Sequence, residues 1–287
     1  MLKYLAFRLA TIVLPFLPAK VGYKMAVFLA DVAYLLAPGP RQAVSDNIRH
    51  VLGPDAEKGI LRRTVRSVFR NTAKNYFDLF RLPQMNMGRI KQNLTILGWE
   101  YFERLRGDGK GVIIATAHLG SVDLVVQVLA AHSIGITVLA EPLKPPILFR
   151  LVRGLRESLG LSFLPVGFST MKAAIRSLKQ GGVVAVACDR DVLGKSIRTS
   201  FFGEETALPT GAIDLALKTG AAILPAFSTR LPDGRFEIRA EPPIVLGAVH
   251  KDDDVGQATA KIVSLLEKHI RRNPGQWVVF ERVWDTN

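Results

Sequence analysis

The residues best suited to chemistry lie in the segment from Gly111 to Asp123, which reads GVIIATAHLGSVD. An apolar run ends at His118, and a glycine at position 120 then leads into a segment with helical spacing. A turn from strand to helix is where α/β proteins place their ligands. We therefore take His118 as the candidate general base.

Asp123 is the acidic residue that follows His118 most closely. Five steps along a straight helix rotate a side chain about 140° beyond a full turn, so the two residues would not share a helix face. If His118 lies in the turn before the helix, the Asp123 carboxylate can reach one ring nitrogen, fix the tautomer and leave the other nitrogen as a base. The backbone N–H groups of Gly120 and Ser121 are then candidates to meet developing negative charge.

The elements that must position this turn follow an α/β pattern, with short runs rich in Val and Ile alternating with amphipathic segments of helical length. The predicted strands are residues 112–117, 136–140, 162–166, 183–188, 222–228, 236–240 and 277–280. The predicted helices are residues 121–132, 147–159, 170–180, 210–219 and 255–272. The runs at 112–115 and 183–187 are apolar throughout, which is typical of central strands covered on both faces.

The first 37 residues differ in character from the rest and are expected to form a hydrophobic membrane anchor, followed by one catalytic domain over residues 38–287. A spanning helix needs about 20 apolar residues, but Pro15, Pro18, Lys20, Lys24 and Asp31 interrupt the run. Aromatic residues interleave with Lys and Arg there, a mixture that favours binding at the lipid interface. A helical hairpin packed on the domain is the alternative.

The charge of the chain is strongly basic, with a formal net charge of +13. Residues 1–81 hold 13 Lys and Arg against 5 Asp and Glu, which accounts for +8 of this total. The basic excess therefore adjoins the most hydrophobic part of the chain and indicates an anionic lipid surface. Cys188 is the only cysteine, so an intrachain disulfide is excluded, and its apolar surroundings indicate a buried strand residue.

A family resemblance rests on motifs spread over nearly the whole chain. They are Gly98-Trp99-Glu100, His118-Leu119-Gly120, Arg156-Glu157-Ser158-Leu159-Gly160, Asp189-Arg190-Asp191, Phe201-Phe202-Gly203, Pro209-Thr210-Gly211 and Pro274-Gly275-Gln276-Trp277. In these motifs the chain resembles the bacterial lipid A biosynthesis acyltransferases and their relatives that acylate phosphatidylinositol mannosides. Both belong to the larger glycerolipid acyltransferase group with its His-x4-Asp/Glu motif.

The resemblance implies a mixed central sheet flanked by helices, with His118 as the base and Asp123 as its orienting acid. It makes Arg156 a candidate for steadying a phosphate or the thioester oxygen. Further candidates for substrate binding are Gly120, Ser121, Asp189, Arg190, Asp191, Phe201, Phe202 and Gly203. The implied donor is an acyl thioester of acyl carrier protein or coenzyme A, with no other cofactor and no metal. The acceptor is a hydroxyl of a membrane glycolipid, and aspartate at position 123 leaves it open between lipid A precursors and inositol mannosides.

Two other functions compete with acyl transfer. Asp189-Arg190-Asp191 after an apolar run is also a D-x-D triplet, which in many glycosyltransferases holds a divalent metal with a nucleotide sugar. The net charge would also suit a nucleic-acid-binding protein, but the basic residues adjoin apolar segments and no zinc or RNA-binding pattern is present. We therefore expect no nucleic-acid partner and place the protein on the cytoplasmic face of a bacterial inner membrane.

Overall fold

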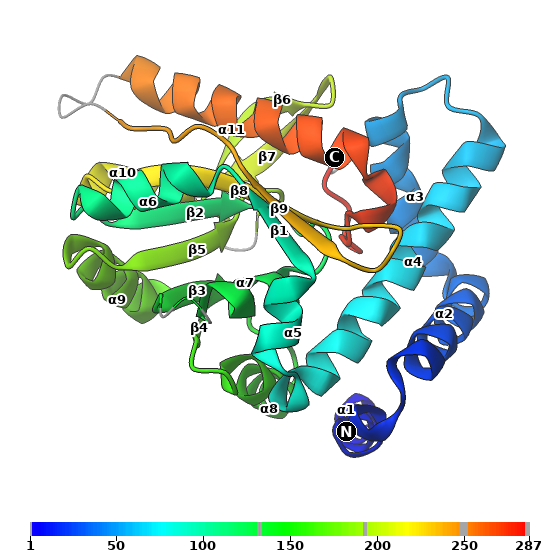
Figure 1. Ribbon diagram of the computed structural model, residues 1–287. Helices are drawn as coiled ribbons and strands as arrows, with labels where there is room; N and C mark the ends of the chain where they lie inside the picture. The colour runs from blue at the N-terminus through cyan, green and yellow to red at the C-terminus, as the bar shows by residue number, and fades with distance from the viewer. Residues whose placement is uncertain (1, 131, 133, 192–193, 247–251, 285–287) are drawn as a thin grey trace.

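A seven-stranded sheet forms the centre of the computed structural model, which describes residues 2–130, 132, 134–191, 194–246 and 252–284 (Figure 1). The strand order is β1-β9-β8-β2-β5-β3-β4, and neighbours are parallel except for the antiparallel pair β8 and β9. The expectation of a mixed sheet is therefore confirmed. The strands are β1 Leu94–Leu97, β2 Val112–Thr116, β3 Ile136–Ala140, β4 Ser162–Pro165, β5 Val183–Ala187, β8 Ala222–Arg230 and β9 Phe236–Ala240.

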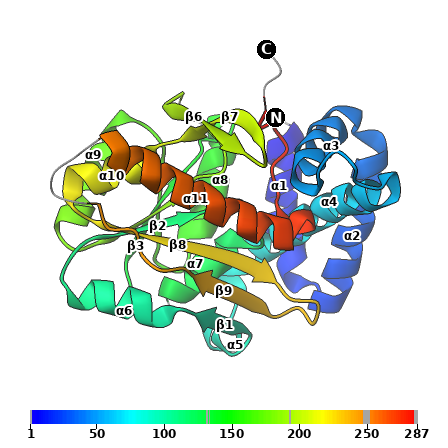
Figure 2. The same ribbon diagram turned by 90° about the horizontal axis from the view of Figure 1, so that it is seen from above.

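Helices cover both faces of this sheet, as its apolar strands require. The described α-helices are α1 Leu2–Val13, α2 Ala19–Leu36, α3 Pro38–Leu52, α4 Lys58–Arg81, α5 Met87–Gln92, α6 Trp99–Gly107, α7 Val122–Ala130, α8 Pro146–Glu157, α9 Phe168–Lys179, α10 Gly211–Thr219 and α11 Asp252–Arg272. Val112 and Ile114 face a core that includes side chains of α6 and α7, whereas Ile113 and Ala115 face the side of α9, α10 and α11. Figure 2 shows α11 crossing the sheet, with α1 to α4 gathered at one end.

Most of the predicted elements are present within two or three residues of their expected bounds, and β2 and β5 are central as predicted. One expected strand is wrong. Residues 277–280 form no strand, and Trp277 makes only an isolated bridge with Leu119. The hairpin of β6 (Ser196–Phe201) and β7 (Glu204–Pro209) was not predicted. In β6 exposed residues alternate with half-buried ones, and in β7 the buried Thr206 and Leu208 alternate with half-buried residues.

The first two helices pack against α4. Small residues of α2, namely Gly22, Ala26 and Ala30, are buried. A Cβ atom added at Gly22 would lie 2.0 Å from the Phe77 ring, so the two helices meet at a distance that only glycine allows. By length and composition, no single described helix could cross a bilayer, although α2 and α3 together could, with a bend of 97° between them.

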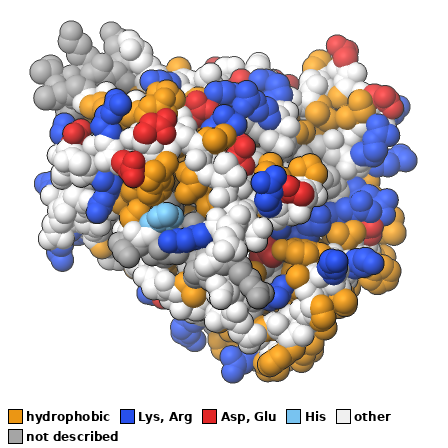
Figure 3. All heavy atoms as spheres, in the orientation of Figure 1, with side chains coloured by type: hydrophobic (Ala, Val, Ile, Leu, Met, Phe, Trp, Pro, Cys, Tyr) orange, Lys and Arg blue, Asp and Glu red, His pale blue; other side chains and the backbone are white. Residues whose placement is uncertain are grey.

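The outer side of the first two helices is strongly apolar. Ten of the thirteen large hydrophobic side chains found exposed among the described residues belong to residues 5–36. They are Leu5, Leu9, Ile12, Val13, Phe16, Val21, Phe28, Leu29, Leu35 and Leu36, and we call them the apolar anchor face. Figure 3 shows hydrophobic side chains with Lys and Arg beside them at the end of the molecule where α1 to α4 lie. Such a continuous exposed apolar surface is typical of a binding face.

Candidate active site

His118 lies two residues beyond the carboxyl end of β2, in a turn that leads into α7. The turn requires a glycine at position 120, because φ is +68° and an added Cβ would lie 2.4 Å from the carbonyl oxygen of Ser228. This combination fixes the backbone that carries the imidazole. The predicted strand-to-helix turn at His118 is therefore present.

The carboxylate that holds the imidazole is Asp189, which follows β5. His118 Nδ1 lies 2.8 Å from Asp189 Oδ1, and the backbone N–H of His118 donates to Oδ2 at 2.9 Å. The indole N–H of Trp277 donates to the same Oδ2 at 2.8 Å. Asp189 is fully buried, and both of its carboxylate oxygens accept hydrogen bonds from His118 or Trp277.

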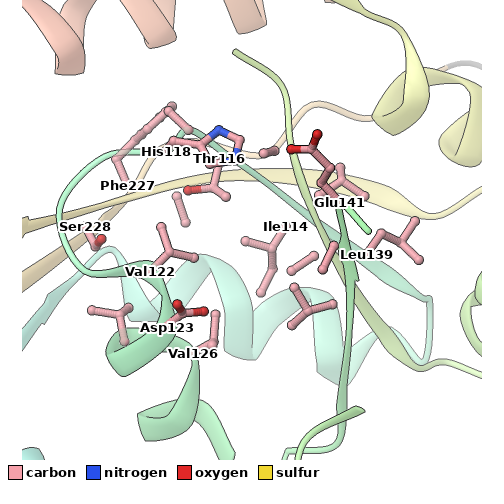
Figure 4. A pocket seen from close by; sticks show the side chains of 18 of the residues that line it. Ile114, Thr116, His118, Val122, Asp123, Val126, Leu139, Glu141, Phe227 and Ser228 are labelled. Atoms are coloured by element: carbon pink, nitrogen blue, oxygen red, sulfur yellow. The ribbon is translucent and has the colours of Figure 1, made fainter. Parts of the chain in front are cut away.

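Asp123 does not contact His118, which differs from the expected pairing. It lies in the first turn of α7, and Figure 4 shows its carboxylate far from the imidazole, on the other side of Val122. Asp123 instead forms an ion pair with Arg156 of α8, in which Arg156 Nε lies 2.7 Å from Oδ1 and Nη2 donates to Oδ2 at 3.0 Å. The first turn of α7 thus presents Asp123 to Arg156 of α8 and not to His118.

The electrostatics of the His118–Asp189 pair favour a basic histidine. Burial opposes the charged form of His118, but the adjacent Asp189 carboxylate outweighs it and raises the pKa of His118 above its usual value. Burial likewise opposes ionisation of Asp189, but the charge and hydrogen bond of His118 and the bond from Trp277 hold the pKa of Asp189 below its usual value. An ionised carboxylate only accepts hydrogen bonds, so Nδ1 carries the proton and Nε2 is the free base.

A cavity of about 720 Å³ opens beside His118. Much of its wall is apolar and comes from the sheet face that α6 and α7 cover, including Trp99, Phe102, Ile114, Val126, Val138, Phe163, Ala185 and Leu224. Charged side chains on the wall include Glu141, Arg190, Asp191, Lys195, Asp214 and Lys218. Such a wall suits an alkyl chain that ends at a polar reacting group.

Four of the remaining predicted site residues line this cavity, namely Gly120, Arg156, Arg190 and Asp191. Arg156 lines it while paired with Asp123, and Asp191 lines it close to Arg190. Arg190 forms ion pairs with Glu141 and, at 3.5 Å, with Glu281. The roles of these side chains toward a substrate stay predictions.

The surroundings of Gly120, Ser121, Phe201, Phe202 and Gly203 within the protein are as follows. The Gly120 N–H donates to the carbonyl oxygen of Gln276 at 3.0 Å and is not free to meet an oxyanion. Ser121 is buried at the start of α7. Phe201 is fully buried and stacks on Trp284, and Phe202-Gly203 forms the turn of the β6–β7 hairpin, outside the described wall of the cavity.

The two carboxylates of the D-x-D triplet accept hydrogen bonds from groups within the protein. Both oxygens of Asp189 are bonded within the protein, and Asp191 Oδ1 accepts a bond from the Gly194 N–H at 2.9 Å. Over the part of the chain that the structure describes, no three His, Cys, Asp or Glu side chains cluster in a way suited to a metal ion. Cys188, beside this triplet, is buried as expected, and burial raises the pKa of its thiol to about 12.

Comparison with known proteins identifies a family for this chain. The family model described as bacterial lipid A biosynthesis acyltransferase matches residues 2–286. The phosphatidylinositol mannoside acyltransferase of Mycolicibacterium smegmatis is 27% identical over 90% of this chain and 84% of its own length. The lipid A biosynthesis lauroyltransferase of Escherichia coli is 26% identical over 69% of this chain and 64% of its own. The crystal structure of the 1-acyl-sn-glycerophosphate acyltransferase PlsC from Thermotoga maritima aligns with a TM-score of 0.40, 14% identity, and coverage of 86% of this chain and 94% of that one.

Proposed function

The chain belongs to the bacterial lipid A biosynthesis acyltransferases, and we propose that it moves a fatty acyl group from a thioester to a hydroxyl of a membrane glycolipid, with His118 as the general base. The observation that carries the proposal is the His118–Asp189 pair beside a largely apolar cavity. The free Nε2 can accept a proton, and the cavity offers space for an acyl chain. Membership of this family makes the chain an acyltransferase and supports acyl transfer over the two competing functions considered above.

The reaction needs no covalent enzyme intermediate, because a thioester is already activated. The acceptor oxygen attacks the thioester carbonyl carbon while its proton passes to Nε2 of His118. The developing imidazolium is stabilised by the buried Asp189 carboxylate at 2.8 Å. The carbon–sulfur bond then breaks, and the leaving thiolate takes the proton from His118. Base assistance of this kind supplies about 10²–10⁴-fold, so alignment of the two substrates must supply much of the remainder.

We propose that the donor is an acyl thioester of acyl carrier protein or coenzyme A, with its chain in the apolar part of the cavity. The acceptor is a glycolipid of the inositol mannoside or lipid A precursor type. The inositol mannoside is the first to test, because the relative of that name aligns with 90% of this chain and the lauroyltransferase with 69%.

The apolar anchor face supports attachment to the cytoplasmic side of the inner membrane, where thioester donors are made. The exposed basic residues Arg62 and Arg63 of α4 lie on the helix that packs against α2 and suit anionic headgroups. We propose that α1 and α2 lie in the membrane interface, so that a lipid acceptor reaches the cavity without leaving the bilayer.

The test is acyl transfer by the purified chain on anionic vesicles. Radiolabelled palmitoyl-coenzyme A and palmitoyl-acyl carrier protein are each offered with phosphatidylinositol dimannoside or a tetra-acylated lipid A precursor, and the lipids are separated by chromatography. We expect a labelled product from at least one combination and its loss in His118→Ala. The matched control is His50→Gln, a histidine outside the described cavity wall. Full activity of a folded His118→Ala variant would show that His118 is not the base.

A further inference from the structure

The turn that carries His118 is held from three directions. Each of its three consecutive carbonyl groups accepts a hydrogen bond from a different part of the chain. The bonds are from Val278 N–H to His118 O at 2.8 Å, from Ser228 Oγ to Leu119 O at 2.8 Å, and from Asn75 Nδ2 to Gly120 O at 2.5 Å. Only the third bond comes from the helices at the N-terminal end of the molecule, because Asn75 belongs to α4.

Asn75 is itself the end of a buried polar network. Its Oδ1 accepts a hydrogen bond from Arg230 Nη2 at 3.3 Å, and Arg230 forms an ion pair with Asp78. The other Asp78 oxygen accepts a hydrogen bond from the Tyr23 hydroxyl at 2.6 Å. A continuous chain of bonds therefore runs from α2 through α4 and the end of β8 to the Gly120 carbonyl.

Burial makes each member of this network dependent on the others. The side chains of Asp78 and Arg230 are only 1% and 8% exposed, so both charges rely on protein partners rather than water. Tyr23 supplies one of those partners. Burial and the Asp78 charge raise the pKa of Tyr23 to about 12, so its hydroxyl remains a donor over the working pH range. A fully bonded network of this kind holds its side chains in one arrangement.

The helix that supplies Tyr23 is the same helix that carries part of the apolar anchor face. Val21, Phe28 and Leu29 point outward from α2, whereas Gly22 and Ala26 pack inward on the side of α4. Arg230 lies over the Tyr23 ring, 5.5 Å from its centroid, which fixes this side of α2 to β8 as well. The outer side of α2 thus faces the surroundings while its inner side joins the network.

We propose that Asn75 and Tyr23 are positioning residues for the base His118, and that α2 is part of the catalytic framework as well as of the anchor. The inference rests on the proposed function of His118. Loss of the Asn75 bond frees the Gly120 carbonyl two residues from the imidazole, while both bonds to Asp189 remain. The proton affinity of His118 is then unchanged, but its imidazole is no longer held in line with the acceptor hydroxyl. A displacement of a catalytic group by about 1 Å can reduce a rate about 10²-fold.

A double-mutant cycle on kcat tests whether the two residues act through one network. With the donor and acceptor pair that the wild-type protein uses, we expect Asn75→Ala to lower kcat about 10–100-fold and Tyr23→Phe about 3–10-fold, with KM and the pH profile nearly unchanged. Coupled residues give non-additive effects, so the double variant should match Asn75→Ala alone. Multiplied losses would overturn the proposal.

The control is Tyr34→Phe, on the same helix, because the Tyr34 hydroxyl makes no hydrogen bond within the described chain. It should leave kcat unchanged. Equal losses in Tyr23→Phe and Tyr34→Phe would mean that any change in α2 acts through the anchor and not through the network.

Hydrogen exchange gives a second measurement that does not need acyl transfer. The Gly120 N–H is bonded to Gln276 O, so loosening of the turn should speed its exchange. We expect faster exchange in a peptide spanning residues 117–121 in both Tyr23→Phe and Asn75→Ala, with β2 unchanged. If the wild-type protein transfers no acyl group, the proposed function fails while this experiment still tests the network. Unchanged exchange in both variants would overturn the proposal.

Discussion

Replacing Asp189 by asparagine tests which carboxylate, Asp189 or Asp123, orients His118. Two donors, the His118 N–H and the Trp277 indole, point at the Oδ2 position. The amide oxygen of the substituted side chain must occupy that position to accept them, so its NH₂ group faces His118 Nδ1. Nδ1 then has to be the acceptor, and the ring proton moves to Nε2. Asp189→Asn therefore removes the base from the nitrogen that faces the cavity while it preserves the size of the side chain.

The expected loss is the whole contribution of base assistance, about 10²–10⁴-fold in kcat. KM should change little, because Asp189 is fully buried and lies outside the described cavity wall. The assay is the initial rate of acyl transfer to the active acceptor at saturating donor, together with thermal unfolding to confirm that the variant is folded.

The pH profile provides an independent readout. A base works when deprotonated, so the wild-type rate should rise with pH through the pKa of His118, which the Asp189 charge raises above the ordinary value of 6.5. Asp189→Asn removes that charge, so the residual activity should rise at a lower pH than in the wild-type protein.

Asp123→Asn is the matched control. Its carboxylate pairs with Arg156, so the substitution should weaken that ion pair. The pH at which the rate of acyl transfer rises should stay unchanged. The role of Asp189 is refuted if Asp123→Asn shifts the pH at which the rate rises and lowers kcat at least as much as Asp189→Asn. It is also refuted if folded Asp189→Asn keeps more than about one tenth of wild-type kcat, since base assistance is worth at least about 10²-fold.

Three further predictions concern the cavity, the anchor and the turn. Ala185→Phe fills part of the apolar wall, so rates with long acyl thioesters should fall about tenfold relative to short ones in a series of graded chain length; an unchanged preference would place the acyl chain elsewhere. Phe28→Asp should weaken binding to anionic vesicles about tenfold or more in a sedimentation assay, whereas Val245→Asp, an equally exposed site outside the anchor face, should not. Gly120→Ala places a Cβ 2.4 Å from Ser228 O at positive φ, so kcat should fall and thermal unfolding should show a loss of about 1–3 kcal/mol; wild-type behaviour would mean that the turn adapts.

Much of the fold could be predicted because local patterns decide it. The apolar runs at β2 and β5 have no polar face, so they belong in the centre of a covered sheet, where they lie. The β6–β7 hairpin was not predicted because its strands are half exposed and their alternation of apolar and polar residues is weak. Trp277 was misread as a strand residue, since its burial reflects the indole bond to Asp189 rather than sheet pairing.

The candidate site was predictable in part. His118 could be found because an apolar strand ends at it and a glycine follows. The buried network of Tyr23, Asp78, Arg230 and Asn75 left no such signal, because its members are spread over more than two hundred residues and only the folded chain brings them within hydrogen-bonding distance. Their polar types are ordinary for helix surfaces, and burial alone makes them informative.

Asp189 is the residue that strand pairing, rather than spacing, could have revealed. In a parallel sheet the carboxyl ends of neighbouring strands meet at one edge, so residues at equal distances beyond paired positions become neighbours. Thr116 of β2 pairs with Ala187 of β5, and two residues beyond them stand His118 and Asp189. Each central run ends in the same way, with a small apolar residue and then a titratable one. Had the two runs been assumed adjacent, the register would have chosen Asp189 over the nearer Asp123, which the first turn of α7 carries toward Arg156.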